Sequence, residues 1–169
     1  MATPTNLPAS FSTGAVLTAA QMNDLRGAFR ILQVVQAAYG VGTTNNTNVL
    51  ADTGLTATIT PSSTSSKVLI IVTHNGVAKE AGNANSSVYL SLRRGLTEIL
   101  QYNSMLFTGV SELMIGTWTQ VFLDSPATTS ATTYKTQFAN MVNAAGVNIN
   151  RSIGSGFQRS DIVLMEVSA

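Results

Sequence analysis

The stretch Leu55-Thr-Ala-Thr-Ile-Thr-Pro-Ser-Ser-Thr-Ser-Ser-Lys-Val-Leu-Ile-Ile-Val-Thr73 predicts a strand, a polar turn and a second strand. Apolar residues from Leu55 to Ile59 alternate with threonines, which is the two-residue period of a strand with one buried face. Pro61 ends this strand because proline has no N–H for a ladder. The apolar run Val68–Val72 is rich in β-branched residues and predicts a central strand buried on both faces. Nothing in this stretch is reactive, which favours a structural role.

Similar strand patterns recur along the rest of the chain, separated by turn residues. They cover Ile31–Tyr39, Val49–Thr53, Val88–Arg93, Thr97–Tyr102, Thr117–Leu123, Tyr134–Met141, Val147–Ile153 and Ile162–Val167. The dipeptides Asn75-Gly76 and Arg94-Gly95 indicate turns, and residues 40–48, 79–87 and 124–133 indicate loops or bends. About nine or ten short strands at this spacing are typical of β-sandwiches and jelly rolls.

Residues 1–16 are expected to form an extended arm, because Pro4 and Pro8 oppose a helix. Only Leu7, Phe11 and Val16 offer apolar anchors. Three buried side chains return too little free energy to order sixteen residues, so we expect a partner surface to hold the arm.

One short α-helix is expected after the arm. Thr18-Ala-Ala-Gln21 has the spacing of a capping box, and Gly27 weakens the pattern further on. An apolar stripe accompanies it: Leu17, Met22, Leu25, Phe29 and Leu32. The stripe fits either the face of a helix packed on a core or a seam between subunits. We therefore divide the chain into a docking and oligomerisation segment, residues 1–30, and a jelly-roll-like antiparallel β-sandwich, residues 31–169.

Composition excludes several classes of protein. Charged residues make up 10% of the chain, where an ordinary soluble domain has about 25%. A net charge of +1 predicts neither nucleic-acid binding nor a polybasic membrane anchor. The absence of cysteine excludes a disulfide scaffold and Cys-ligated metal centres. No signal peptide and no apolar run long enough to cross a membrane are recognisable, so we expect synthesis in the cytoplasm.

Catalytic, cofactor-binding and metal-binding residues are not expected. The eight carboxylates occur mostly singly at turns or strand ends, which disfavours the paired acids of a polysaccharide-degrading enzyme. His74 is the only histidine and follows an apolar strand, so a structural or exposed role is favoured over a Ser-His-Asp site. Glycine-rich phosphate-binding loops do not occur.

Four residues are candidates to face a ligand. Arg93 and Arg94, with Tyr89 nearby, form a basic–aromatic group, although two arginines at a hairpin tip are more typical of a solvated edge. Trp118 is a candidate platform for stacking a sugar, and as the lone tryptophan in a strand pattern it is more typical of a core or an interface.

The chain resembles small structural proteins of tailed bacteriophages, of the head-decoration, head-fibre or tail-fibre type. The similar segments are Gly14-x-x-Leu-Thr-Ala-Ala-Gln-x-Asn23, Leu32-Gln-Val-Val35, Thr58-Ile-Thr-Pro-Ser-Ser-Thr-Ser-Ser-Lys-Val-Leu69, the bend Leu123–Tyr134 and the closing strand Ile162–Val167. The resemblance implies a virion accessory protein with a β-sandwich or jelly-roll body, commonly trimeric, and it carries over no catalytic residues.

We therefore expect a non-enzymatic virion structural protein, made in the host cytoplasm, that assembles as a homotrimer. Its arm and helix would dock on the particle through Leu7, Phe11, Val16, Leu17, Met22, Leu25 and Phe29. A capsid decoration or head-fibre protein bound to the major capsid protein comes first, because the chain is short. A tail fibre or tail adaptor bound to a tail protein is the close alternative. A module that binds a host glycan or receptor is the alternative of a different class.

Overall fold

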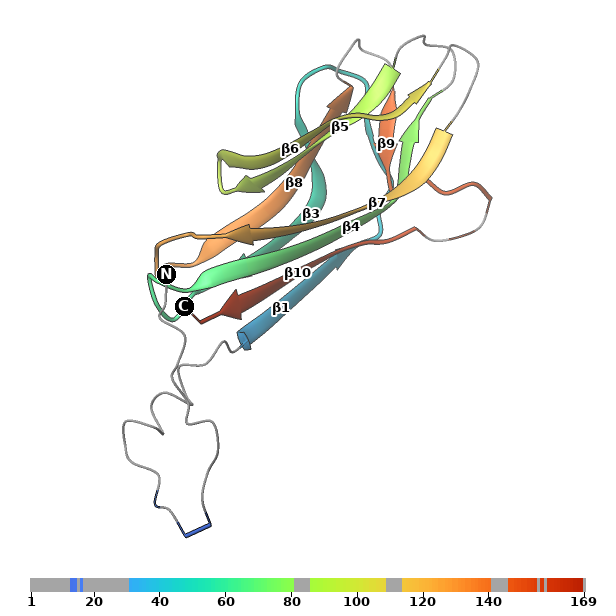
Figure 1. Cartoon of the computed structure of the whole chain (residues 1–169). Helices are drawn as coiled ribbons and strands as arrows, with labels where there is room; N and C mark the ends of the chain where they lie inside the picture. The colour runs from blue at the N-terminus through green and yellow to red at the C-terminus, as the bar shows by residue number, and fades with distance from the viewer. Residues whose placement is uncertain are drawn as a thin grey trace.

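The computed structural model describes residues 13–14, 16, 31–80, 86–108, 114–140, 146–154, 156 and 158–168. Within these residues the chain is mainly β: ten strands form two antiparallel sheets that lie over one another as two layers (Figure 1). The expected short helix and most of the expected arm lie outside the described residues. Of the arm, Thr13 and Gly14 form a turn and Val16 is exposed.

The first sheet is built around the longest strand, β4 (Lys67–Lys79). β10 (Ser160–Val167) pairs with one side of β4, and β1 (Ile31–Tyr39) lies beyond it. On the other side of β4 lies β7 (Met114–Asp124). Two short strands extend the far end of this sheet: β9 (Val147–Ile149) and β2 (Thr43–Asn45).

The second sheet has the order β3-β8-β5-β6. Its strands are β3 (Ala51–Ile59), β8 (Thr132–Asn140), β5 (Ser86–Arg94) and β6 (Thr97–Thr108). β5 and β6 form a hairpin that turns at Gly95, in agreement with the Arg94-Gly95 turn expected from the sequence.

The eight long strands pair in a nested pattern. Without the short β2 and β9, the first strand pairs with the last (β1 with β10) and the second with the seventh (β3 with β8). The third pairs with the sixth (β4 with β7), and the fourth with the fifth (β5 with β6). The chain is therefore one long antiparallel ribbon, folded so that successive pairs fall in alternate sheets.

β4 differs from the sequence-based expectation in two ways. Val68, Ile70 and Val72 are fully buried, but Leu69 and Ile71 on the opposite face are only half-buried, so the strand is central without being buried on both faces. The dipeptide Asn75-Gly76 does not turn the chain. It forms a register shift within β4, with Gly76 at φ 57°, and the carbonyls of both residues accept backbone N–H groups from residues 150–151.

Three other expected boundaries were wrong. The loop of residues 40–48 contains β2, and the two strands expected before Pro61 are a single strand, β3, with a register shift near Gly54. Val147–Ile153 forms a strand only as far as Ile149, since Asn150 adopts φ 57° and leaves the extended conformation.

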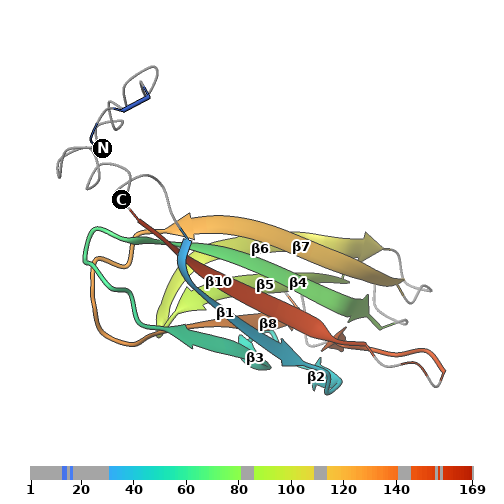
Figure 2. The ribbon, with the colours of Figure 1, turned by 90° about the horizontal axis from the view of Figure 1, so that it is seen from below.

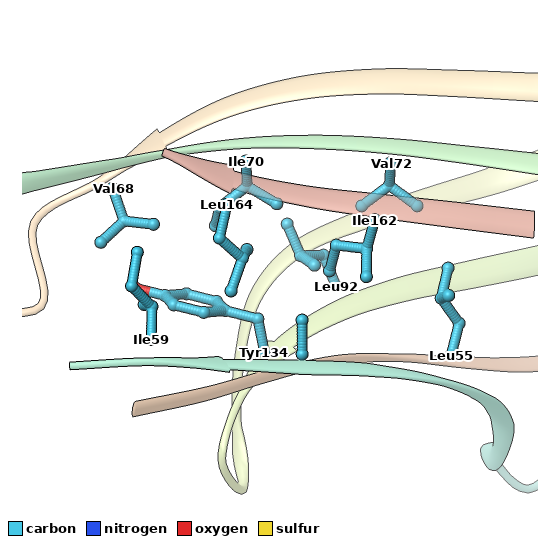
Figure 3. Close-up of a cluster of buried hydrophobic side chains, with 10 residues drawn as sticks. Leu55, Ile59, Val68, Ile70, Val72, Leu92, Tyr134, Ile162 and Leu164 are labelled. Atoms are coloured by element: carbon cyan, nitrogen blue, oxygen red, sulfur yellow. The ribbon is translucent and has the colours of Figure 1, made fainter. Parts of the chain in front are cut away.

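The core lies between the sheets (Figure 3). Side chains of β4 and β10 point toward those of β3, β5 and β8. The largest buried side chain is Tyr134, whose hydroxyl donates to Asp124 Oδ2 at 2.6 Å, and Arg94 pairs with the same carboxylate at 2.8 Å. A smaller second cluster, which includes Phe138 and Ile149, fills the other end of the space between the sheets.

Candidate functional site

The single histidine lies in the interior, at the centre of a chain of hydrogen bonds. His74 Nδ1 lies 2.9 Å from Ser160 Oγ, and Nε2 lies 2.9 Å from Thr136 Oγ1. Ser160 donates its hydroxyl proton to Asn150 Oδ1 at 2.6 Å, so it is placed to accept from the imidazole Nδ1–H. Thr136 meets Thr53 at 2.7 Å between the hydroxyl oxygens. The network ties β4 to β10 and β8 across the sandwich.

This histidine–serine pair has the contact of a hydrolase dyad but not its accessibility. Both side chains are fully buried, and the serine proton is directed to Asn150 rather than to the imidazole. Burial lowers the pKa of His74 to about 4, so the ring is neutral at neutral pH, and it stacks on Trp118 at 5.9 Å between ring centroids. The arrangement supports a structural role for His74.

Two other kinds of site are absent from the part of the chain that the structure describes. There, no group of three or more histidine or acidic side chains comes together to hold a metal ion. Likewise, none of the described residues forms a helix of the length and hydrophobicity that crossing a membrane requires.

The residues expected to face a ligand have protein partners instead. Trp118 is partly buried and packs against both core clusters, with the ring of Tyr102 edge-on at 4.9 Å. Tyr89 is 9% exposed, and burial together with the Glu98 carboxylate raises its pKa to about 12. Arg93 pairs with the same Glu98 at 4.0 Å. With Arg94 held by Asp124, the structure does not bring these four residues together as an open binding surface.

The expected docking residues are described at only one position. Val16 is 90% exposed, and its role as an anchor stays a prediction. Leu7, Phe11, Leu17, Met22, Leu25 and Phe29 lie outside the described residues. Leu32, which the helical stripe included, belongs to strand β1.

A polar cavity of about 350 Å³ lies beside β2 and β9, lined by Gly40, Gly42, Thr43, Thr44, Asn148, Ile149, Asn150, Arg151, Ser152, Gly156 and Gln158. Most of its polar side chains already bind one another or the backbone. Thr44 donates to Asn148 Oδ1 at 2.5 Å, and the Asn150 amide donates to the carbonyls of Tyr39, at the end of β1, and Val41. The cavity is shaped for a small polar group but has few unengaged donors to bind one.

The most distinctive surface is the outer side of the first sheet, where β1, β10, β4 and β7 run side by side in front of the second sheet (Figure 2). Because strand side chains alternate between faces, the residues of these strands that lie between the core-facing ones point outward. Strand register aligns them in rows across the sheet. We call this surface the outer apolar face, and it consists of Val34, Leu69, Ile71, Val121, Leu123, Val163 and Met165.

One row of this face is apolar on all four strands, and the next on three. Val34, Met165, Leu69 and Leu123 lie in register across β1, β10, β4 and β7. In the next row Gln36 occupies the position on β1, and Val163, Ile71 and Val121 occupy the positions on β10, β4 and β7. Val34 is 56% exposed and Val121 is 54% exposed, and the residues on the central strands β4 and β10 are half-buried, so nothing in the described part of the chain covers the face completely.

The outer side of the second sheet provides an internal comparison. It carries charged pairs, such as Lys135 with Asp52 at 2.9 Å and Arg93 with Glu98. Ser91 also donates to Glu98, at 2.6 Å. This side is a self-neutralised polar surface of the ordinary solvent-facing kind, whereas the outer apolar face has charged residues only at its ends, Lys67 and Asp161.

Sequence reasoning missed the outer apolar face. It assigned Leu69 and Ile71 to a strand buried on both sides, and it assigned Thr117–Leu123 to a strand without separating its two faces. The signal was present, because Val121 and Leu123 alternate with Gln120 and Phe122, so both faces of that segment hold apolar residues.

Together these observations define a two-layer antiparallel β-sandwich with one polar and one apolar outer side. Comparison of the chain with models of known protein families and with curated proteins finds no match. The fold, the outer apolar face and the sequence segments described above are therefore the observations that bear on function.

Proposed function

We propose that this protein is a non-enzymatic structural protein of a tailed-bacteriophage virion, with a jelly-roll body. The observation that carries the proposal is the nested pairing of the eight long strands, with sheets in the order β1-β10-β4-β7 and β3-β8-β5-β6. Jelly rolls are eight-stranded double sheets that recur in viral capsid and lectin domains. Fold alone does not define function, so the proposal also rests on the resemblance of the sequence segments to phage structural proteins.

Residues 1–30 supply the docking element in this proposal. Leu7, Phe11 and Val16 anchor the arm, and the stripe of the expected short helix adds further apolar contacts. The partner is a virion protein, with the major capsid protein first and a tail protein second. The β domain follows from Ile31, where β1 begins, and faces away from the particle.

The interior supports a structural rather than a chemical role. Its most reactive pair, His74 and Ser160, is sealed inside the sandwich and forms part of a completed hydrogen-bond chain. The polar surface charges are paired with one another, as described above for Glu98 and Asp52. Such a body is suited to lasting contact with other proteins.

Removal of residues 2–16 tests the docking element. We expect a folded, soluble β domain that no longer incorporates into particles, measured as copies per particle by quantitative mass spectrometry. Phe11→Asp should remove most of the incorporation, because it places a charge in an apolar contact. Ser10→Asp is the matched control and should incorporate like the wild type. Full copy number for the truncated protein would refute docking by the arm.

The same measurement separates the two virion locations. Hundreds of copies per particle would indicate capsid decoration, and a handful would indicate a tail component. A glycan- or receptor-binding module is the second candidate function, and the shape of the polar cavity beside β2 and β9, rather than its hydrogen-bonding capacity, is the observation that favours it. Specific binding on a glycan array that Asn148→Ala abolishes would place this candidate first.

A further inference from the structure

We propose that the outer apolar face of the first sheet is the contact surface between copies of this chain. The inference deepens the proposed structural role and rests on it, since it adds the self-assembly expected from the sequence, but it does not depend on where in a virion the protein sits. It assigns a specific surface to the expected homotrimer, and this surface lies on the β domain rather than in residues 1–30.

The dimensions of the face suit the apolar centre of an ordinary interface. With about 4.8 Å between strands and about 3.4 Å per residue, two rows across four strands cover roughly 260 Å². Ile31, which is 59% exposed, Leu32 and Val167 extend the apolar area at the start of β1. A standard interface buries about 800 Å² on each partner, with an apolar centre and a polar rim.

The rim is present on the same strands. Gln36 borders the face on β1, and Lys67 lies at one end of β4. At the other end Thr73 and Thr119 are bonded to each other, with 3.1 Å between the hydroxyl oxygens. Asp161 is engaged by Arg159 at 3.0 Å. Polar groups therefore lie at both ends of the apolar rows along β4, while no charged group interrupts the rows.

A second copy of the chain is the occupant that this surface fits best. The apolar rows present no charge, so rotation-related copies bring no like charges together and require no opposite patch on a different protein. The backbone groups of the central strands β4 and β10 are paired within the sheet, which leaves side-chain packing as the contact. Around a threefold axis three such faces can converge, so that one part of each face packs on another part of the next copy and the ring closes. The net charge of +1 gives little repulsion between copies.

Light scattering after gel filtration tests this inference on the full chain. The wild type should have three times the single-chain mass of 17.7 kDa at micromolar concentration. Val121→Lys should shift the midpoint of assembly to a concentration at least about tenfold higher. Thr58→Lys is the matched control, since Thr58 is exposed in a strand on the outer side of the second sheet, and it should assemble like the wild type.

Single cysteines provide a second measurement that does not require a disruptive change. The chain has no cysteine, so Val121→Cys and Thr58→Cys each introduce one unique thiol. In the assembled protein a maleimide should modify the thiol at 121 several-fold more slowly than the thiol at 58. The difference should vanish on dilution to the monomer.

Three results would overturn the inference. They are a wild-type mass of 17.7 kDa at all concentrations, equal assembly of the two lysine variants, or protection of the thiol at 121 in a monomer. The last result would mean that residues 1–30 of the same chain cover the face. Assembly through this face by a protein that is missing from particles would support the inference and refute the virion role. Failure of the inference and failure of the virion proposal are therefore distinguishable.

Discussion

Lowering the pH from 7 to 4.5 is expected to weaken the fold through one residue, His74. Its imidazole is fully buried and its two ring nitrogens contact the hydroxyls of Ser160 and Thr136, with no charged partner in these contacts. Protonation would place an unpaired charge in the core and break the bond that Nε2 accepts from Thr136. Burial accordingly lowers the pKa of His74 to about 4.

The direction and the size of the effect follow from this pKa. The folded-state pKa lies below the unfolded value of about 6.5, so the unfolded chain takes up the proton first. The free energy of unfolding is therefore highest above pH 6.5 and falls as the pH is lowered toward 4. At 1.36 kcal/mol per pKa unit the total loss is about 3 kcal/mol. A typical domain has only about 5–15 kcal/mol in all.

A second titratable group, the Glu166 carboxyl, affects stability only at lower pH, so its effect can be separated from that of His74. Burial would raise the pKa of Glu166, but hydrogen bonds from Gln33, Ser62 and Ser66 outweigh burial and hold this pKa at about 2. Its stabilising contribution is complete above pH 4.5 and is lost as the pH falls toward 2. Measurements between pH 7 and 4.5 therefore report on His74.

Urea unfolding at a series of pH values, at one fixed protein concentration, measures the loss directly. Because the sequence has a single histidine, its imidazole proton also gives one unambiguous NMR titration in the folded protein. His74→Gln should abolish most of the pH dependence above 4.5. A folded-state titration near pH 6.5, or a flat free energy of unfolding from pH 7 to 4.5, would refute the assignment of His74 to the sealed interior.

Two further predictions concern the packing of the sandwich. Tyr134→Phe removes the hydroxyl that donates to buried Asp124 and should cost about 1–3 kcal/mol of unfolding free energy. Tyr89→Phe removes a hydroxyl that donates to the more open Glu98 carboxylate and should cost less than about 1 kcal/mol. Equal losses of the two variants in urea unfolding would contradict this. Gly76→Ala should cost about 2–5 kcal/mol, because φ is 57° and a Cβ would lie 2.4 Å from the Arg151 carbonyl oxygen. Gly95 has a similar φ with open space around it, so Gly95→Ala should cost only about 1–2 kcal/mol. Calorimetric melting curves that show Gly95→Ala to be the more destabilising of the two would count against the bulge in β4.

Much of the secondary structure was predictable from local patterns. The alternation in Leu55–Ile59 and the β-branched run Val68–Val72 each fall in a strand, because side-chain period and β-branching act over a few residues. The prediction of a turn at Asn75-Gly76 was wrong because a contact with residues distant in sequence decides the conformation there. The dipeptide is compatible with a turn, and only the backbone of residues 150–151, distant in sequence, holds it as a bulge within a continuing strand.

The candidate site was much less predictable than the strands. Trp118 was considered as a platform for a ligand, and its position beside His74 and Tyr102 depends on the contact between two layers. The outer apolar face combines residues from β1, β10, β4 and β7, which are spread from residue 34 to residue 165. No local window contains that pairing.

The sequence by itself determined that the chain is mainly β, poor in charge and free of cysteine, because these are properties of composition and of short-range period. Tertiary structure alone decided which apolar residues are buried. Val68 and Leu69 are neighbours of similar hydrophobicity, yet one faces the second sheet and the other faces solvent. Their difference arises from the side of the sheet that a second layer covers, and a layer is formed by strands that meet only when the whole chain has folded.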